Sequence, residues 1–208
     1  MTIERGKEWG RQGIVPADAA TLASDRAVAQ HVARGVLGAG EPGGGGPLVV
    51  RLAGGDLYRT LGRPPLVVAG DPARLVPVDA LRLRLGEGAV QVAVAHVVAR
   101  RSWWRGPVVA VMNAQFVGQF DVAPRSHPND GLADIVETTT MAVSQRWHAW
   151  RRLPNGTHVP HPAVRERRLP AVEMIFERPL RVWLDGEAAG EARTLTVEVV
   201  PDAFLVAV

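Results

Sequence analysis

The chain has 208 residues, a formal net charge of +3 and no cysteine. The lack of cysteine excludes disulfides, thiolate zinc sites and cysteine nucleophiles. The charged start, residues 1–13, has no apolar run of the kind a secretory signal needs, and no stretch approaches the roughly 18 apolar residues of a membrane span. We therefore expect a soluble, cytoplasmic protein, with peripheral attachment to a membrane as an alternative.

Nearly all of the basic residues are arginine, since Lys7 is the one lysine. Arginine is the better partner for phosphate and carboxylate groups, so the composition favours an anionic ligand or a membrane surface. A coding bias that replaces lysine with arginine explains the same composition. Charge alone therefore does not identify a partner.

The first half of the chain predicts one helix followed by several strands. Ser24-Asp25 offers an N-cap, and Val28, Val32 and Val36 recur at helical spacing, so we expect a helix over 25–37. The glycine-rich run 38–46 follows this helix and contains a proline, so we interpret it as a flexible linker and not as a nucleotide-binding loop. Valine-rich segments bounded by glycine and proline then predict strands at 48–52, 64–69, 76–85, 90–98 and 108–112.

The second half predicts one more helix and a group of closing strands. The helix covers 141–153, with Val143, Trp147 and Trp150 on one face and Arg146 mostly elsewhere. Further strands are predicted at 171–176, 180–184, 195–200 and 204–208. Many short strands with two or three helices are typical of an α+β protein that is mainly β, and we expect an antiparallel β-sandwich.

Two Asp-Gly turns place carboxylates where chemistry would use them. Asp185 and Glu187 flank Gly186 at the end of an apolar strand, an arrangement that suits general acid–base catalysis or a hard cation. Asp-Gly is also the commonest hairpin turn, and the turn interpretation is favoured here. Asp130 with Gly131 presents the same choice.

One predicted hairpin tip combines two tryptophans with three arginines. Trp103 and Trp104, together with Arg100, Arg101 and Arg105, suit a bilayer interface with anionic headgroups or stacking on single-stranded nucleic acid. The alternative is that the indoles pack back onto the sheet or into a dimer contact.

Several short motifs occur in a recognisable order. They are Gly55-Asp56-Leu57-Tyr58-Arg59-Thr60-Leu61-Gly62, Val78-Asp79, Asn113 followed by Gly118, Ala123-Pro124, Asn129-Asp130-Gly131-Leu132, and Leu184-Asp185-Gly186-Glu187. Their order and spacing resemble the C-terminal half of the diacylglycerol kinase and sphingosine kinase superfamily, which has an NAD kinase-like fold. The resemblance implies a β-sandwich domain of the lipid-kinase C-terminal type at 54–208, with one or two further helices. Residues 1–53 would form a short N-terminal α/β appendage.

The resemblance also implies a set of site residues. Asp185 would be the general base that takes the proton from a lipid hydroxyl as it attacks the γ-phosphate of ATP, and Glu187 would be its carboxylate neighbour. Asp56 would belong to a magnesium-linked network. Asp130 and the carbonyl of Leu132 would form a structural Mg²⁺ site, and the lipid would enter a cleft in the β-rich domain.

The nucleotide-binding half of that family is missing from this sequence. Gly54-Gly55-Asp56 continues with Leu57-Tyr58 instead of the Gly-Thr that completes the family's Gly-Gly-Asp-Gly-Thr motif. We therefore expect a stand-alone lipid-binding or interaction module, a pseudoenzyme that does not bind ATP by itself and that forms a homodimer. The alternative is half of an ATP-dependent lipid or hydroxyl kinase, completed by a partner chain or by self-association. Nucleic-acid binding rests only on the arginines and the tryptophan pair.

Overall fold

The computed structural model describes residues 8–37, 47–138, 141–157 and 161–208, so the predicted linker 38–46 lies outside the described residues. The strands are β1 (Arg11–Ile14), β2 (Ala20–Leu22), β3 (Val49–Leu52), β4 (Pro72–Leu85), β5 (Val90–Ala93), β6 (His96–Arg100), β7 (Val108–Met112), β8 (Phe116–Val117), β9 (Phe120–Asp121), β10 (Ala133–Thr138), β11 (Val164–Leu169), β12 (Ala171–Leu184) and β13 (Glu187–Ala207). The helices are α1 (Asp25–Leu37), α2 (Asp56–Thr60) and α3 (Val143–Arg152), and α3 runs into a 3-10 turn, Leu153–Asn155. None of the described helices is long and apolar enough to cross a membrane.

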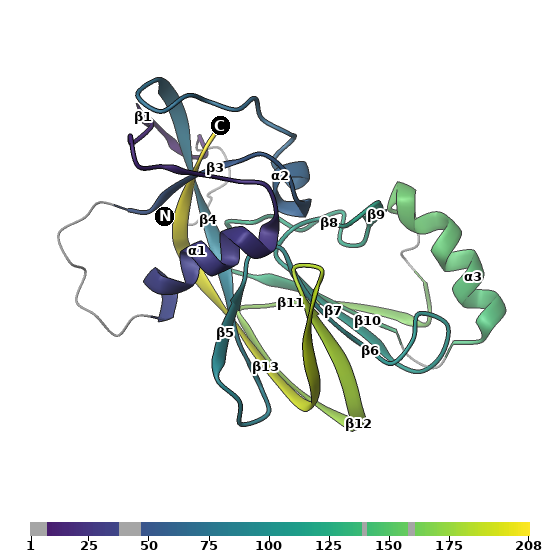
Figure 1. Cartoon of the computed structure of the whole chain (residues 1–208). Helices are drawn as coiled ribbons and strands as arrows, with labels where there is room; N and C mark the ends of the chain where they lie inside the picture. The colour runs from purple at the N-terminus through teal and green to yellow at the C-terminus, as the bar shows by residue number, and fades with distance from the viewer. Residues whose placement is uncertain (1–7, 38–46, 139–140, 158–160) are drawn as a thin grey trace.

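Long antiparallel strands make up most of the fold (Figure 1). The described strands form an eleven-stranded sheet whose main path runs β1-β4-β13-β12-β6-β7-β10-β11, while β8 and β9 form a separate hairpin. Side chains of β4, β12 and β13 pack against those of β6, β7 and β10, as Leu81, Val111, Ile135 and Leu195 illustrate. The mainly β, α+β fold expected from the sequence is confirmed.

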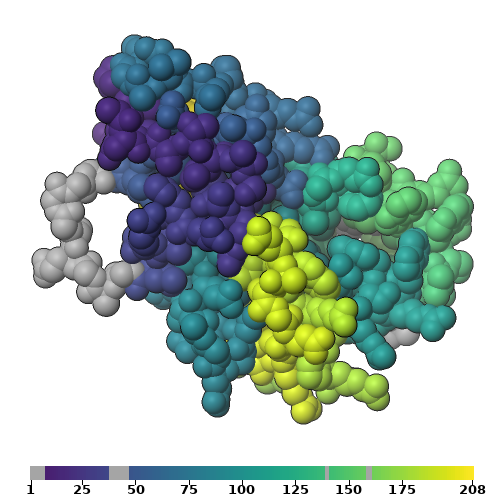
Figure 2. Space-filling view, viewed as in Figure 1, coloured from purple at the N-terminus to yellow at the C-terminus, as the bar shows by residue number. Residues whose placement is uncertain are grey.

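The N-terminal segment is part of the same sheet. β2 and β3 are parallel and are joined through α1, which buries Val28 and Val32 against a second core that includes Val78 and Phe204. β1 pairs with β4, and β3 pairs with β13. In Figure 2 the yellow C-terminal strands meet the purple N-terminal segment near the centre of the face shown. The expected N-terminal appendage, residues 1–53, and the expected sandwich domain, residues 54–208, are therefore joined by backbone hydrogen bonds.

The polar connection between β9 and β10 is fixed by one buried carboxylate. Asp79 of β4 is fully buried and accepts hydrogen bonds from the backbone N–H groups of Gly131 (2.8 Å) and Asp202 (2.9 Å). It also accepts one from the side-chain amide of Asn129 (3.2 Å). Asp79 thus ties the loop before β10 to both β4 and β13.

The prediction of a strand at 64–69 is wrong. This segment is an irregular loop, since Pro64 and Pro65 lack the N–H groups that a strand ladder uses. Leu66 and Val68 are 55% and 63% exposed, so the loop contributes little to the core.

Other strands differ from the sequence prediction in their limits. A bend at Val94 and Ala95 divides the predicted strand 90–98 into β5 and β6. The four predicted C-terminal strands merge into β12 and β13, which continue through bulges. The sequence does not predict β1, β2 or β11, which are short or, as in β11, dominated by charged residues.

The face of α3 that carries Val143, Trp147 and Trp150 is not its buried face. Val143, Trp147 and Trp150 are 52%, 44% and 43% exposed, whereas Arg146 is 6% exposed. An arginine therefore faces the sheet, and the apolar side chains of the helix remain largely in contact with solvent.

Candidate functional site

Four ionisable side chains meet where the N-terminal segment contacts the sandwich: Asp25, Asp56, His96 and Asp185, here called the acid–histidine cluster. His96 begins β6 and is 1% exposed, and its Nε2 lies 3.0 Å from Asp56 Oδ2. Asp25 begins α1, and Asp185 follows β12. The sequence predicts Asp56 and Asp185 as site residues but gives no role to His96 and treats Asp25 only as part of a helix cap.

Asp185 is held by three backbone donors. The N–H groups of Val94, Ala95 and His96 donate to its carboxylate at 3.0, 2.9 and 3.1 Å. Its φ of 50° and the φ of 86° at Gly186 form the tight turn between β12 and β13. Burial raises the pKa of Asp185, opposed by the charge of His96 and by these N–H groups. The carboxylate of Asp185 thus connects this turn to the bend after β5 through hydrogen bonds. This geometry does not favour the predicted role of Asp185 as a general base.

Asp25 positions α2. Its carboxylate accepts hydrogen bonds from the backbone N–H groups of Asp56 and Leu57, the latter at 3.0 Å. A Cβ atom at Gly55 would overlap this carboxylate, and Gly55 has a φ of 100°. Glycine at position 55 therefore leaves room for the carboxylate of Asp25.

Asp56 is the member of the acid–histidine cluster that lies next to the β8–β9 hairpin. Its Oδ2 accepts a hydrogen bond from the N–H of Gly118 (2.9 Å) as well as contacting His96, and its side chain is 17% exposed. Burial lowers the pKa of His96, but its hydrogen bond with Asp56 and the charges of Asp185, Asp56 and Asp25 raise the pKa overall. This pair is suited to hold a proton between Asp56 and His96.

The burial of Asp25 predicts a measurable dependence of stability on pH. Burial, together with the charges of Asp185 and Asp56, raises the pKa of Asp25 from 3.8 to about 6. The folded state therefore takes up a proton as the pH falls through about 6, while the unfolded chain does so only near 3.8, so stability rises over this interval. We expect the parent protein to gain about 2–3 kcal/mol relative to Asp25→Asn between neutral and acidic conditions.

Urea denaturation of both proteins at pH values above and below this interval measures the effect. Asp18→Asn, at an exposed position, serves as the control. The stabilities of this variant and of the parent protein should differ by the same amount at every pH. Parallel curves for the parent and Asp25→Asn would contradict the assignment.

Glu187 lies apart from the acid–histidine cluster. Its side chain is 65% exposed, and its Oε2 lies 3.7 Å from Nε of Arg26 on α1. Arg26 also donates to the carbonyl of Val92 (3.1 Å). Glu187 thus contributes a surface ion pair between α1 and the β12–β13 turn.

Asp130, which is predicted to bind Mg²⁺, forms an ion pair with an arginine. The guanidinium of Arg168 on β11 contacts the carboxylate of Asp130, and its Nε lies 3.2 Å from Asp134 Oδ1. Asp130 Oδ1 also accepts a hydrogen bond from the N–H of Leu132 (3.0 Å). A positive charge already neutralises the carboxylates that a divalent cation would use, so these residues do not fit the predicted structural Mg²⁺ site. Among the described residues, no group of three or more histidines, cysteines or carboxylates is arranged to hold a metal.

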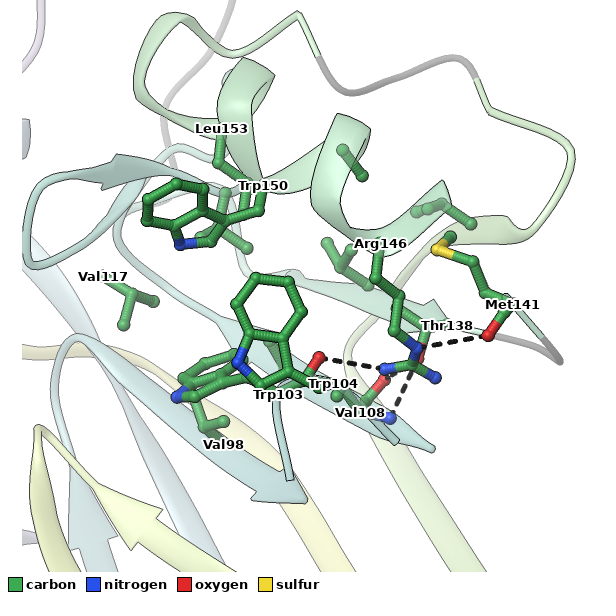
Figure 3. Close-up of a pocket in the computed structure, with 15 residues that line it drawn as sticks. Val98, Trp103, Trp104, Val108, Val117, Thr138, Met141, Arg146, Trp150 and Leu153 are labelled. Atoms are coloured by element: carbon green, nitrogen blue, oxygen red, sulfur yellow. Dashed lines mark hydrogen bonds between the residues drawn. The ribbon is translucent and has the colours of Figure 1, made fainter. Parts of the chain in front are cut away.

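An apolar cavity of about 110 Å³ lies between α3 and the outer face of the sheet, and we call it the α3 cavity (Figure 3). Its walls are almost entirely apolar, with Arg146 and Thr138 at one end. The lining residues include Val98, Ala110, Val117, Val136, Ala149, Leu153, Trp103, Trp104 and Trp150. An apolar protein cavity of roughly 150 Å³ binds benzene, so the α3 cavity has room for a small apolar group or the end of a chain.

The predicted tryptophan surface adjoins this cavity. Trp103 and Trp104 line the cavity, yet they remain 46% and 40% exposed. The Trp104 and Trp150 rings lie 6.2 Å apart. Arg101 and Arg105 are exposed, whereas Arg100 is stacked between the rings of Trp103 and Trp183. The indoles therefore form a rim that neither packs fully onto the sheet nor stands free of it.

Comparisons with known proteins agree with this fold. The model of the YegS C-terminal NAD kinase beta sandwich-like domain matches residues 80–208. A diacylglycerol kinase structure from Bacillus anthracis str. Sterne aligns with a TM-score of 0.52 and 14% identity over 76% of this chain and 66% of that chain. A second structure from the same organism, assigned as a diacylglycerol kinase, gives a TM-score of 0.56 and 13% identity over 76% and 69% of the two chains. No curated protein matches.

At these identities the structural likeness shows the fold alone, and the chain spans about two thirds of the length of these structures. The family match covers more than half of the chain and includes β12, β13 and the turn between them that carries Asp185. The chain therefore belongs to the family of YegS C-terminal NAD kinase beta sandwich-like domains.

Proposed function

We propose that this protein is a lipid-binding module without kinase activity of its own, which rests on an anionic membrane surface and takes an apolar part of a lipid into the α3 cavity. The observation that carries the proposal is the apolar cavity bordered by exposed indoles. The structures that share the fold are named for diacylglycerol, which is itself a lipid.

The chemistry of the rim supports membrane contact. Indole rings favour the boundary between the apolar and headgroup layers of a bilayer, and nearby arginines attract anionic headgroups. Four of the chain's six tryptophans lie on α3 or on the connection from β6 to β7, all of them more than a third exposed. Arg101, Arg105, Arg151 and Arg152 are exposed on the same two segments.

The anchoring of Asp185 supports a binding role over catalysis. A carboxylate that accepts three backbone hydrogen bonds would have to give up at least one of them to remove a proton from a substrate hydroxyl. The half-kinase alternative is favoured by a different observation, the partly exposed Asp56 beside His96. It needs a partner chain or a second copy of this chain to supply the nucleotide site.

Removing the two indoles of the rim is expected to weaken membrane binding. The parent protein should sediment with vesicles that contain anionic phospholipid, and Trp103→Ala/Trp104→Ala should bind at least about tenfold more weakly, a loss of about 1.4 kcal/mol or more. Vesicle sedimentation over a range of lipid concentrations measures both affinities.

The matched control is Leu66→Ala/Val68→Ala, which removes two exposed apolar side chains from another surface. This variant should bind as the parent does. If the parent does not bind vesicles, or binds a single-stranded oligonucleotide instead, the proposed function is wrong.

A further inference from the structure

Arg146 is a buried charge at the junction of two hollows. It is 6% exposed and lines the α3 cavity at the end where Thr138 and Met141 lie. The same three residues line a second, open hollow on the other side, whose wall carries three more arginines and two glutamates. They are Arg101, Arg178, Arg181, Glu177 and Glu191.

The hydrogen bonds of Arg146 leave its charge uncompensated. Nε donates to the carbonyl of Met141 (3.4 Å) and Nη1 donates to that of Trp103 (3.2 Å) (Figure 3). Nη2 donates to the carbonyl of Gly106. A guanidinium has five N–H donors, so these bonds leave two available. Carbonyl oxygens carry no formal charge, and none of the ion pairs among the described residues includes Arg146.

Some other arginines of this fold are paired with carboxylates. Arg168 lies between two carboxylates, and Arg82 lies 2.7 Å from Glu198 although both are about half exposed. A buried charge without a counter-ion is costly, so an anion that reached Arg146 would gain more than one that reached an exposed arginine. Burial also lowers the pKa of the Arg146 guanidinium, which is the direction expected for a cation removed from water.

We propose, building on the proposed function, that the ligand is an anionic amphiphile, with a carboxylate or phosphate head bound by Arg146 and the apolar chain in the α3 cavity. The guanidinium presents paired N–H groups that suit both kinds of head. The cavity of about 110 Å³ takes the part of the chain next to the head, and the remainder lies along the indole rim. A lipid with an uncharged head fills the cavity without meeting the charge of Arg146.

Calorimetric titration with eight-carbon probes tests the proposal. Octanoate and octyl phosphate, used below the concentration at which they form micelles, should bind the parent protein at least about tenfold more tightly than octanol does, the difference expected for a hydrogen-bonded charge. Inorganic phosphate, which has the head without the chain, should bind far more weakly. Arg146→Gln should remove the preference for the charged probes, whereas the exposed Arg152→Gln on the same helix should keep it.

A second variant tests the site without changing Arg146, in case Arg146→Gln alters the position of α3. Ala149→Phe fills the cavity from the helix and leaves Arg146 in place, so it should weaken octanoate and octanol binding alike. Unchanged octanoate binding by Ala149→Phe would overturn the place of the apolar chain in the α3 cavity. Equal affinity for octanol and octanoate, or unchanged octanoate binding by Arg146→Gln, would overturn the assignment of the anionic head. If vesicle binding persists in that case, the proposed function survives; if no amphiphile and no vesicle binds, both proposals fail. Binding of octanoate but not of anionic vesicles would identify a free fatty acid or lysolipid, and not a bilayer headgroup, as the source of the ligand.

Discussion

Replacing Asp79 by alanine is expected to lower the free energy of unfolding by about 4 kcal/mol, since a buried donor that loses its acceptor costs about 1–3 kcal/mol. The carboxylate of Asp79 accepts hydrogen bonds from Gly131, Asp202 and Asn129, all within 3.2 Å. Because 1 kcal/mol corresponds to roughly 2–4 °C in a protein of this size, the thermal midpoint should fall by about 10 °C. Urea denaturation and a thermal scan measure the two quantities.

The hydrogen bonds of Asp79 allow the predicted loss of stability to be tested with two further variants. Burial raises its pKa, and the three donors oppose that rise. Asp79→Asn keeps one acceptor oxygen and should lie between the parent and the alanine variant. Asp18→Ala, on the surface, should change the free energy of unfolding by less than about 0.5 kcal/mol. A similarly small loss for Asp79→Ala would show that the loop before β10 is held by other contacts.

Asp185→Ala should destabilise the protein by about 3 kcal/mol, because the N–H groups of Val94, Ala95 and His96 would lose their acceptor together. Alanine also disfavours the φ of 50° found at this position. Binding to anionic vesicles should be retained at temperatures where the variant is folded, since the α3 cavity does not include Asp185.

Asp185→Ala distinguishes the lipid-binding module from the half-kinase alternative. A residue that serves only as a catalytic base contributes little to folding, so an unchanged free energy of unfolding would favour the half-kinase alternative. Glu187→Ala is the control, because its exposed carboxylate makes only a surface ion pair and should contribute less than about 1 kcal/mol.

The strands that form the core could be predicted because their pattern is local. Valine-rich runs bounded by glycine or proline identify β3, β4 and β7 within a few residues. The segment β11 reads VRERRL, and its burial pattern shows mostly exposed side chains, so no apolar pattern indicates a strand. Since β11 carries Arg168, the partner of Asp130 and Asp134 could not be predicted either.

The candidate sites depend on contacts between distant parts of the chain. His96 stands inside an apolar strand, and nothing in its own sequence indicates that Asp56, forty residues earlier, lies beside it. Arg146 shows the limit of helical periodicity: counting apolar residues groups Val143, Trp147 and Trp150 on one face of the helix. It does not show that the carbonyl groups of the neighbouring loop hold the guanidinium of Arg146 on the buried side. The position of a residue along a helix does not predict which hydrogen-bond acceptors lie on the surface that faces the helix.

The place of β13 in the sheet has a consequence for synthesis. β13 is the last strand of the sheet along the chain, yet it lies between β4 and β12 and also pairs with β3. Until residues 187–207 have left the ribosome, β4, β12 and β3 each lack one of the neighbours that supply their hydrogen bonds. The sheet therefore cannot be completed before β13 is made, and until then the strand edges that β13 will cover are open to incorrect pairing.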